Sequence, residues 1–304
     1  MTTLGCIGQG FVGNALTQAF REYFEVLTYD KKFSDMTVYK NKDSYQIQKQ
    51  FPIKELVREC SIIFVCVPTP MNPDGSCNIL IVNGVLNELE KECFYQDRHV
   101  NVVIKSTIPP GSTEAFNKNY PHLNVCFNPE FLREVSAEED YKNQKFIIAG
   151  GKLSCVKMLR DICKEAFPEA VFYECASTMA ELVKYTINCY LAVKVSFANE
   201  IKQLCDSLGV SYSAMINIAQ LDSRLGDSHW QVPGYDRLLG FGGSCFPKDL
   251  NGLINVMIEK GIDPMVLQAA WTKNLEVRPE RDWENLIGRA VIGRTNDERK
   301  ERVA

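Results

Sequence analysis

The chain has 304 residues, of which 45% are hydrophobic and 24% are charged, and its formal net charge is −4. That length allows about two domains with buried cores, and a weakly acidic chain is a poor candidate for binding nucleic acid. The sequence contains no apolar stretch long enough for a signal peptide or a membrane span, so we expect a cytoplasmic protein. Its twelve cysteines include no CxxC pair, and we predict no metal site.

Short apolar runs alternate with amphipathic segments through the first half of the chain. The predicted strands are Thr3–Gly8, Val26–Asp30, Ser61–Val67, Asn101–Thr107, Asn124–Phe127, Phe146–Gly150 and Val171–Cys175. The predicted helices between them are Val12–Tyr23, Ile53–Cys60, Leu80–Cys93 and Ser154–Ala166. Continuous apolar strands bounded by helices indicate an α/β fold, in which helices cover both faces of a doubly wound, parallel, Rossmann-type sheet.

The second half of the chain has the pattern of helices. Thr178 and Glu181 match a capping box and Gly209 is a stop signal, which together predict one helix of about thirty residues. We expect this helix to be a spine between domains or a dimer element. Shorter helices are predicted at Ser213–Leu221, Leu250–Glu259 and Pro264–Glu276, which gives a small all-helical domain. The expected organisation is a Rossmann domain over residues 1–176, a helical domain over 177–276 and a charged tail over 277–304, within which the segment NDERKER is expected to be solvated and mobile.

A glycine-rich loop lies between the first predicted strand and the first helix. Gly8, Gly10 and Gly13 form a GxGxxG pattern that permits a tight turn, close approach of the backbone to a pyrophosphate, and close packing of helix on strand. Asp30 ends the next strand, where a carboxylate accepts both ribose hydroxyls of NAD and repels a 2′-phosphate. Lys31 and Lys32 follow, and either can contact a 2′-phosphate, but the carboxylate decides the prediction for NAD over NADP.

Two polar groups stand out in the helical half. Lys184 and Asn188 are one helical turn apart and share a face, where they can polarise a hydroxyl and hold a water. A solvated lysine beside an unrelated asparagine has the same spacing. Cys245 differs from the other cysteines, since it lies in the loop "LGFGGSCFPKDL", with glycines before it and Lys248 and Asp249 after it.

Seven segments, in this order along the chain, resemble the UDP-glucose/GDP-mannose dehydrogenase family of nucleotide-sugar 6-dehydrogenases. They are IGQGFVG, VPTP (Val67–Pro70), KSTIPPG (Lys105–Gly111), NPEFLRE (Asn128–Glu134), ELVKYTIN (Glu181–Asn188), DSRLG (Asp222–Gly226) and GFGGSCFPKD (Gly240–Asp249). The resemblance implies oxidation of a primary alcohol through the aldehyde to a carboxylate, with two NAD molecules reduced. UDP-glucose is the simplest substrate on this resemblance, and UDP-glucuronate is then the product.

The resemblance also implies roles for individual residues. Cys245 is the expected nucleophile, which passes through a thiohemiacetal and a thioester. Lys184 is expected to stabilise the oxyanion, and Asn188 and Asp249 to position or activate water. Thr107 and Glu130 are similar to residues that hold water and substrate oxygens near the thiol. The cofactor-binding residues implied are Gly8, Gly10, Phe11, Val12, Gly13, Asp30, Thr69, Thr107, Glu134 and Lys248.

The substrate-binding residues implied are Glu130, Phe131, Leu132, Arg133, Lys184, Asn188, Arg224, Tyr235 and Gly242. Arg224 is similar to an arginine that reaches the substrate of a neighbouring subunit, so we expect a homodimer. Family members usually continue into a further nucleotide-binding domain, and we expect a short form that lacks it. The loop Gly226–Leu239, with His229, Trp230 and Tyr235, either stacks on the base or is a surface loop with one buried aromatic residue.

Two other functions stay open on the sequence. One is a single-step, NAD-dependent dehydrogenase of the β-hydroxyacid type, whose relatives share the glycine loop, the long helix and the Lys/Asn pair but have no need of GGSCFPKD. The other is a non-catalytic, NAD-binding homologue.

Overall fold

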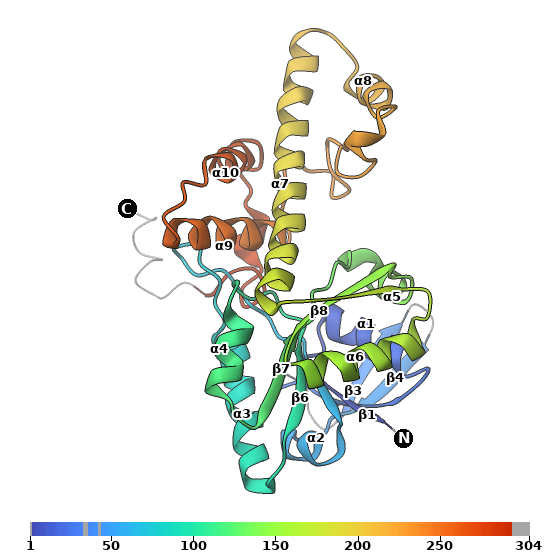
Figure 1. The fold of residues 1–304 in the computed structure, drawn as a ribbon. Coiled ribbons are helices and arrows are strands. Elements are labelled where there is room, and N and C mark those ends of the chain that lie inside the picture. Colours follow the sequence, from blue (N-terminus) through green and yellow to red (C-terminus); the bar gives the residue numbers. More distant parts are fainter. Residues whose placement is uncertain (1, 33–35, 42–43, 294–304) are drawn as a thin grey trace. The chain divides into compact units, whose positions relative to one another are not determined.

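The computed structural model describes residues 2–32, 36–41 and 44–293 (Figure 1). The chain divides into two compact units, here called unit 1 and unit 2. Unit 1 consists of Met1–Thr69 and Ile79–Lys184, and unit 2 consists of Pro70–Asn78 and Tyr185–Ala304.

Unit 1 is built on a seven-stranded sheet with the order β2-β1-β5-β6-β7-β8-β9. The strands are β1 (Thr3–Ile7), β2 (Glu25–Tyr29), β5 (Ile62–Val65), β6 (Val100–Ile104), β7 (Leu123–Phe127), β8 (Phe146–Gly151) and β9 (Val171–Cys175). All neighbours are parallel except β7 and β8, so the predicted α/β class is confirmed and the all-parallel pairing is wrong at one place. Gly151 permits this antiparallel contact, since a Cβ there would lie 2.6 Å from the Cα of Cys126.

Helices cover both faces of this sheet (Figure 1). One buried cluster contains residues of α1 (Phe11–Phe20), α5 (Ala137–Lys142) and α6 (Leu153–Ala166), and the other contains residues of α2 (Ile53–Glu59), α3 (Leu80–Gln96) and α4 (Ser112–Asn119). Successive strand residues enter opposite clusters, as Phe64 and Val65 do, because side chains alternate across a strand. This is the doubly wound arrangement expected from the sequence.

A hairpin of β3 (Met36–Asn41) and β4 (Ser44–Lys49) is also present, with Met36 opposite Lys49. No strand is predicted there from the sequence, and the stretch "MTVYKNKDSYQIQK" is too polar for a strand buried on both faces. The helices α4 and α5 and the short 3-10 turn Glu134–Ser136 are likewise not predicted from the sequence.

The long helix is α7 (Ser177–Ser207), which has 31 residues, but the predicted capping box is wrong. Thr178 lies inside the helix, and the Glu181 carboxylate accepts hydrogen bonds from the backbone N–H of Gly111 at 2.5 Å, and from the N–H and hydroxyl of Thr113 at 2.8 and 2.6 Å. Glu181 therefore satisfies backbone donors at the start of α4 rather than of its own helix. Burial raises the pKa of Glu181, although these hydrogen bonds act to lower it.

Unit 2 is helical and contains α7 from Tyr185 onward, α8 (Tyr212–Ala219), α9 (Phe246–Glu259) and α10 (Met265–Val277). Short 3-10 turns lie at Ser223–Leu225 and Asp282–Asn285. One apolar cluster joins α7 to α9 through residues such as Tyr185 and Leu250, and a second joins α7 to α8. Within the described ranges, no helix is long and apolar enough to cross a membrane.

The residues just after α10 are folded, although residues 277–304 are expected from the sequence to form a charged tail outside the helical domain. Arg278 is 2% exposed and Trp283 is 1% exposed, with the Trp283 ring 5.3 Å from that of Trp271. The difference arises because the many charged residues of this stretch indicate an exposed segment, whereas Trp283 and Arg278 are buried in the fold. The segment NDERKER, residues 296–302, lies outside the described residues.

Candidate functional site

The glycine loop after β1 has the shape that a dinucleotide requires. Gly8 has φ +91°, and a Cβ there would lie 2.6 Å from the carbonyl oxygen of Cys66. A Cβ at Gly13 would lie 1.9 Å from the oxygen of Gly8, so both glycines are needed for the turn itself. Gly10 is different, because it has φ −71° and no described atom lies within 4 Å of its would-be Cβ. Open space beside the backbone, at the start of α1, fits the pyrophosphate of NAD.

Asp30 is fixed beside this loop. One carboxylate oxygen accepts from the backbone N–H of Gln9 at 2.7 Å, and the other from the N–H of Lys32 at 2.9 Å. A carboxylate has about four acceptor sites, so Asp30 keeps capacity for ribose hydroxyls. The Lys32 side chain is exposed. The loop and Asp30 together fit NAD, as the sequence predicts.

Of the other residues predicted at the cofactor, Phe11 and Val12 open α1 and are partly buried, and Glu134 is exposed. Thr69 and Thr107 are both buried, at 3% and 7% exposure. Thr107 lies just beyond the end of β6. In a sheet of this kind, ligands bind outside the carboxyl ends of the strands, so Thr107 has the expected position in unit 1.

Lys184 and Glu130 form a buried ion pair in unit 1. The Lys184 Nζ lies 3.2 Å from Glu130 Oε1 and donates a further hydrogen bond to the Glu130 backbone oxygen, and the two side chains are 4% and 9% exposed. The same ammonium lies 5.2 Å from the centre of the Phe131 ring. An ammonium that is held in place and shielded from water is suited to stabilising a developing negative charge.

Lys105 directly follows the apolar run VNVVI and is buried, but it is not singled out from the sequence. Its Nζ donates to Asn128 Oδ1 at 2.9 Å and to the Pro129 oxygen at 3.4 Å, and burial lowers its pKa. Asn128 in turn donates to the oxygen of Ile148 at 2.7 Å. These contacts fix the turn that carries Glu130.

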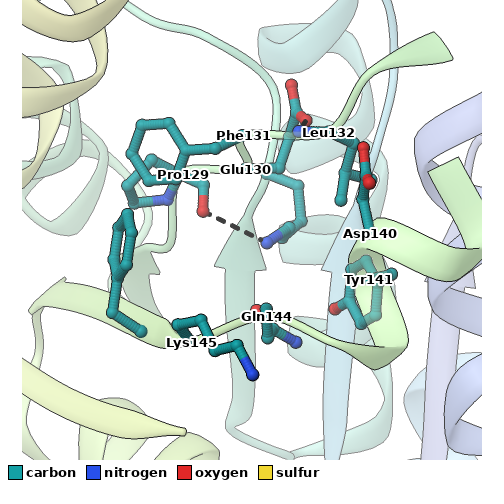
Figure 2. Close-up of a pocket in the computed structure, with 10 residues that line it drawn as sticks. Pro129, Glu130, Phe131, Leu132, Asp140, Tyr141, Gln144 and Lys145 are labelled. Atoms are coloured by element: carbon teal, nitrogen blue, oxygen red, sulfur yellow. Dashed lines mark hydrogen bonds between the residues drawn. The ribbon is translucent and has the colours of Figure 1, made fainter. Parts of the chain in front are cut away.

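A pocket of about 160 Å³ lies beside this turn. Figure 2 shows Pro129, Glu130, Phe131 and Leu132 facing Gln144 and Lys145 across it. Leu132 is thus part of the wall.

Arg133, which the sequence places at the substrate, pairs with Asp140. Its Nη2 lies 2.6 Å from Oδ1 of Asp140 and its Nε lies 3.0 Å from Oδ2. These hydrogen bonds lower the pKa of Asp140 to about 2. The Arg133 side chain is 73% exposed, so the pair lies at the surface of unit 1.

Unit 2 brings together three of the predicted catalytic and cofactor residues. The Asp249 carboxylate is 2% exposed, with Oδ1 at 2.5 Å from Lys248 Nζ and Oδ2 at 2.6 Å from Asn188 Nδ2. Burial acts to lower the pKa of Lys248, but the charges on Asp249 and Cys245 raise it above its ordinary value. The resemblance places Lys248 at the cofactor, and in the structure its ammonium lies on the Asp249 carboxylate.

Cys245 stands at the start of α9, one helical turn before Asp249. Its carbonyl oxygen accepts the backbone N–H of Asp249 at 2.9 Å, and its Sγ lies 3.8 Å from Ser244 Oγ. The residue is partly exposed, unlike the core cysteines such as Cys189. The amino end of a helix favours negative charge and therefore the thiolate form of a cysteine.

The two glycines before Ser244 and Cys245, Gly242 and Gly243, have different surroundings. A Cβ at Gly242 would lie 2.3 Å from Arg278 Nη2, so any larger residue there would displace the Arg278 guanidinium. Gly243 has φ +70° with no described atom within 4 Å of its would-be Cβ. The open side of the loop is thus at Gly243.

The loop Gly226–Leu239 buries one aromatic residue. Trp230 is 8% exposed, donates from Nε1 to the Gly226 oxygen at 3.0 Å, and has Lys194 Nζ 4.7 Å from its ring centre. Tyr235 is 94% exposed. The Arg224 side chain is 88% exposed and bonds the Asp222 carboxylate.

Residues 178–276 match the central domain of the UDP-glucose/GDP-mannose dehydrogenase family, and residues 25–167 match its NAD binding domain. The chain belongs to this family. The NAD-binding match begins after the glycine loop, and it contains Asp30.

Named relatives agree with the family assignment. The chain is 31% identical over 229 residues to a putative UDP-glucose 6-dehydrogenase of Bacillus subtilis. The aligned region covers 71% of this chain and 51% of that protein. It is 34% identical over 232 residues to a UDP-glucose 6-dehydrogenase of Rickettsia prowazekii. This aligned region covers 73% of this chain and 50% of that protein. The chain thus spans about half the length of the curated relatives it matches.

The structure resembles that of a UDP-glucose dehydrogenase from the hyperthermophilic archaeon Pyrobaculum islandicum. The TM-score is 0.81 at 30% sequence identity, over 94% of this chain and 70% of that one. Both domains that the family model matches are therefore present in the fold as well as in the sequence.

Proposed function

We propose that this chain is an NAD-dependent nucleotide-sugar dehydrogenase that oxidises the C6 alcohol of a nucleotide sugar to the carboxylate, with UDP-glucose as the favoured substrate. The observation that carries the proposal is the buried Asp249 carboxylate, one helical turn from Cys245 and bonded to both Lys248 and Asn188. A single-step alcohol dehydrogenase has no use for a thiol in this position. The names of the relatives favour UDP-glucose.

Cys245 has the central role in the second oxidation. Its thiolate adds to the aldehyde carbon to give a tetrahedral thiohemiacetal, and oxidation of this adduct leaves a thioester on Sγ. Water then adds to the thioester carbon, the C–S bond breaks, and the products are a carboxylate and the free thiol. NAD, when bound, supplies the hydride acceptor for both oxidations.

The other residues act on water, on charge and on the cofactor. Asn188 holds Asp249 Oδ2 in place, and the carboxylate accepts the proton of the attacking water. Lys184, oriented by Glu130, stabilises the oxyanion of each tetrahedral adduct. The glycine loop and Asp30 hold the pyrophosphate and ribose of NAD.

The proposed assembly is a homodimer. Exposed apolar side chains on α7 support it, since Tyr190, Phe197 and Leu204 are 62%, 50% and 53% exposed. Arg224 is exposed enough to serve a second subunit. Light scattering after size exclusion gives the mass, and a monomer at every concentration would count against this assembly.

The test of the proposed function is the yield of NADH per sugar across a panel of UDP-, GDP- and N-acetylated sugars. We expect two NADH per UDP-glucose, no carboxylate from Cys245→Ser, and unchanged yield from Cys175→Ser, a matched change at another partly buried cysteine. One NADH per substrate favours the β-hydroxyacid alternative. Tight NAD binding with no turnover on any sugar favours the non-catalytic one.

A further inference from the structure

A buried charged cluster in unit 2, centred on Arg278, has no role in the proposed chemistry. Arg278 follows α10 directly, and its guanidinium makes three kinds of contact. Nε lies 2.6 Å from Asp282 Oδ1, Nη2 lies 2.6 Å from Asp236 Oδ2, and Nη1 donates to the Leu239 oxygen at 3.2 Å. Burial acts to lower the pKa of Arg278, but the carboxylates of Asp282 and Asp236 raise it. The side chain is therefore a fixed cation with fully oriented donors.

Asp282 joins this cluster to the loop before Cys245. Its second carboxylate oxygen accepts the backbone N–H of Gly243 at 3.1 Å, two residues before the thiol. Burial acts to raise the pKa of Asp282, but the hydrogen bonds from Arg278 and Gly243 bring it below its ordinary value. A would-be Cβ at Gly242 lies 2.4 Å from Asp282 Oδ1, so the backbone passes against the ion pair itself.

Asn274 and Asn199 hold the rest of the same loop. Asn274 is fully buried, accepts the N–H of Phe241 at 2.7 Å and donates to the Phe241 oxygen at 3.0 Å. Asn199 Oδ1 accepts the N–H of Gly240 at 3.2 Å. Side chains from three other parts of unit 2 thus bind backbone groups along residues 239–243, a stretch with no helix or strand of its own.

We propose that Arg278 and Asp282 are positioning residues for Cys245. They fix the shape of residues 239–244, and that shape sets where the thiol stands at the start of α9. The proposal rests on the proposed function for the role of Cys245 as nucleophile. Neither side chain takes part in the reaction, since each acts through the backbone of the loop.

The test uses Arg278→Met, Arg278→Lys and Asp282→Asn, with Arg281→Met as the matched control. Arg281 is close in sequence, but its side chain pairs with Glu284 at 3.6 Å. The readouts are kcat and KM with UDP-glucose, the affinity for NAD, and the rate at which iodoacetamide alkylates Cys245 across a range of pH, followed by peptide mass spectrometry. A merely structural role would change the melting temperature but not the pH profile of one thiol.

We expect Arg278→Met and Asp282→Asn to lower kcat by roughly 10- to 100-fold, the size of effect that a displacement of about 1 Å produces. The pH profile of Cys245 alkylation should shift, NAD affinity should be unchanged, and Arg278→Lys should recover part of kcat. If Arg278→Met does not fold, Asp282→Asn decides, since it keeps the shape and removes the charge.

The inference is overturned if folded variants keep the wild-type alkylation profile, or if Arg281→Met shifts it equally. Because alkylation needs no turnover, this outcome is separate from failure of the proposed function: an inactive wild type with an Arg278-dependent profile would keep the positioning role.

Discussion

Replacing Lys248 with methionine removes the cation that lies 2.5 Å from the buried Asp249 carboxylate. Among the described residues, the Asn188 amide at 2.6 Å is then the side chain still bonded to it. A buried charge that loses its partner costs about 3–5 kcal/mol in folding free energy, and we expect this for Lys248→Met at neutral pH. Asn188→Ala removes one hydrogen bond to a charged acceptor and should cost about 1.5–3 kcal/mol.

Tryptophan fluorescence in urea measures this cost, because all three tryptophans of the chain, Trp230, Trp271 and Trp283, lie in unit 2. Lys260→Met, at an exposed lysine that ends the same helix, is the matched control and should change stability by less than about 0.5 kcal/mol.

A second variant tests whether the carboxylate that Lys248→Met leaves uncompensated causes the loss of stability. The double variant Lys248→Met/Asp249→Asn should be less damaged than Lys248→Met alone. A deficit below about 1 kcal/mol, or a double variant that is no more stable than Lys248→Met, would refute the reasoning.

Two further predictions concern unit 1. Gly10→Ala should cost less than about 1 kcal/mol in stability and yet weaken NAD binding, as measured by calorimetry. Gly13→Ala should lower the melting temperature, because its Cβ would lie 1.9 Å from the Gly8 oxygen. Equal stability of the two variants contradicts this. Asp140→Asn should lose under about 1 kcal/mol, since Arg133 is largely exposed. The pKa of Asp140 is about 2 in the folded state and near 3.9 in the unfolded state, so the difference in unfolding free energy between wild type and variant is present above about pH 3.9 and shrinks as the pH falls toward 2. Urea midpoints measure this difference at each pH. A difference that stays constant with pH would contradict the prediction.

Features encoded by neighbouring residues could be predicted from the sequence. The strand, glycine turn and helix of Thr3–Phe20 follow from an apolar run, three glycines and an amphipathic stretch within twenty residues. The sheet class follows in the same way from continuous apolar strands. The antiparallel direction of β8 could not be predicted, because it depends on the path of the chain through α5 rather than on the composition of Phe146–Gly151.

Features that depend on distant partners were interpreted differently or missed. Glu181 has the local spacing of a capping box, yet its partners are Gly111 and Thr113, which nothing near it in the sequence reveals. The resemblance places Gly242 at the substrate, and in the structure the Arg278 guanidinium already fills the space beside it. In both cases the contact that decides the role of the residue comes from a residue far along the chain.

The membership of Pro70–Asn78 in unit 2 bears on how the protein is made. Met71 forms a parallel bridge with Val291, its N–H donates to the Ala290 oxygen at 2.8 Å, and Asn255 donates to the Asp74 oxygen at 3.1 Å. The ribosome delivers Met71 long before Val291, so unit 2 cannot be completed until synthesis passes residue 291. The segment Pro70–Asn78 is therefore synthesised well before the residues that it pairs with. Contacts between residues so far apart in sequence form slowly, and until they form the segment can pair incorrectly.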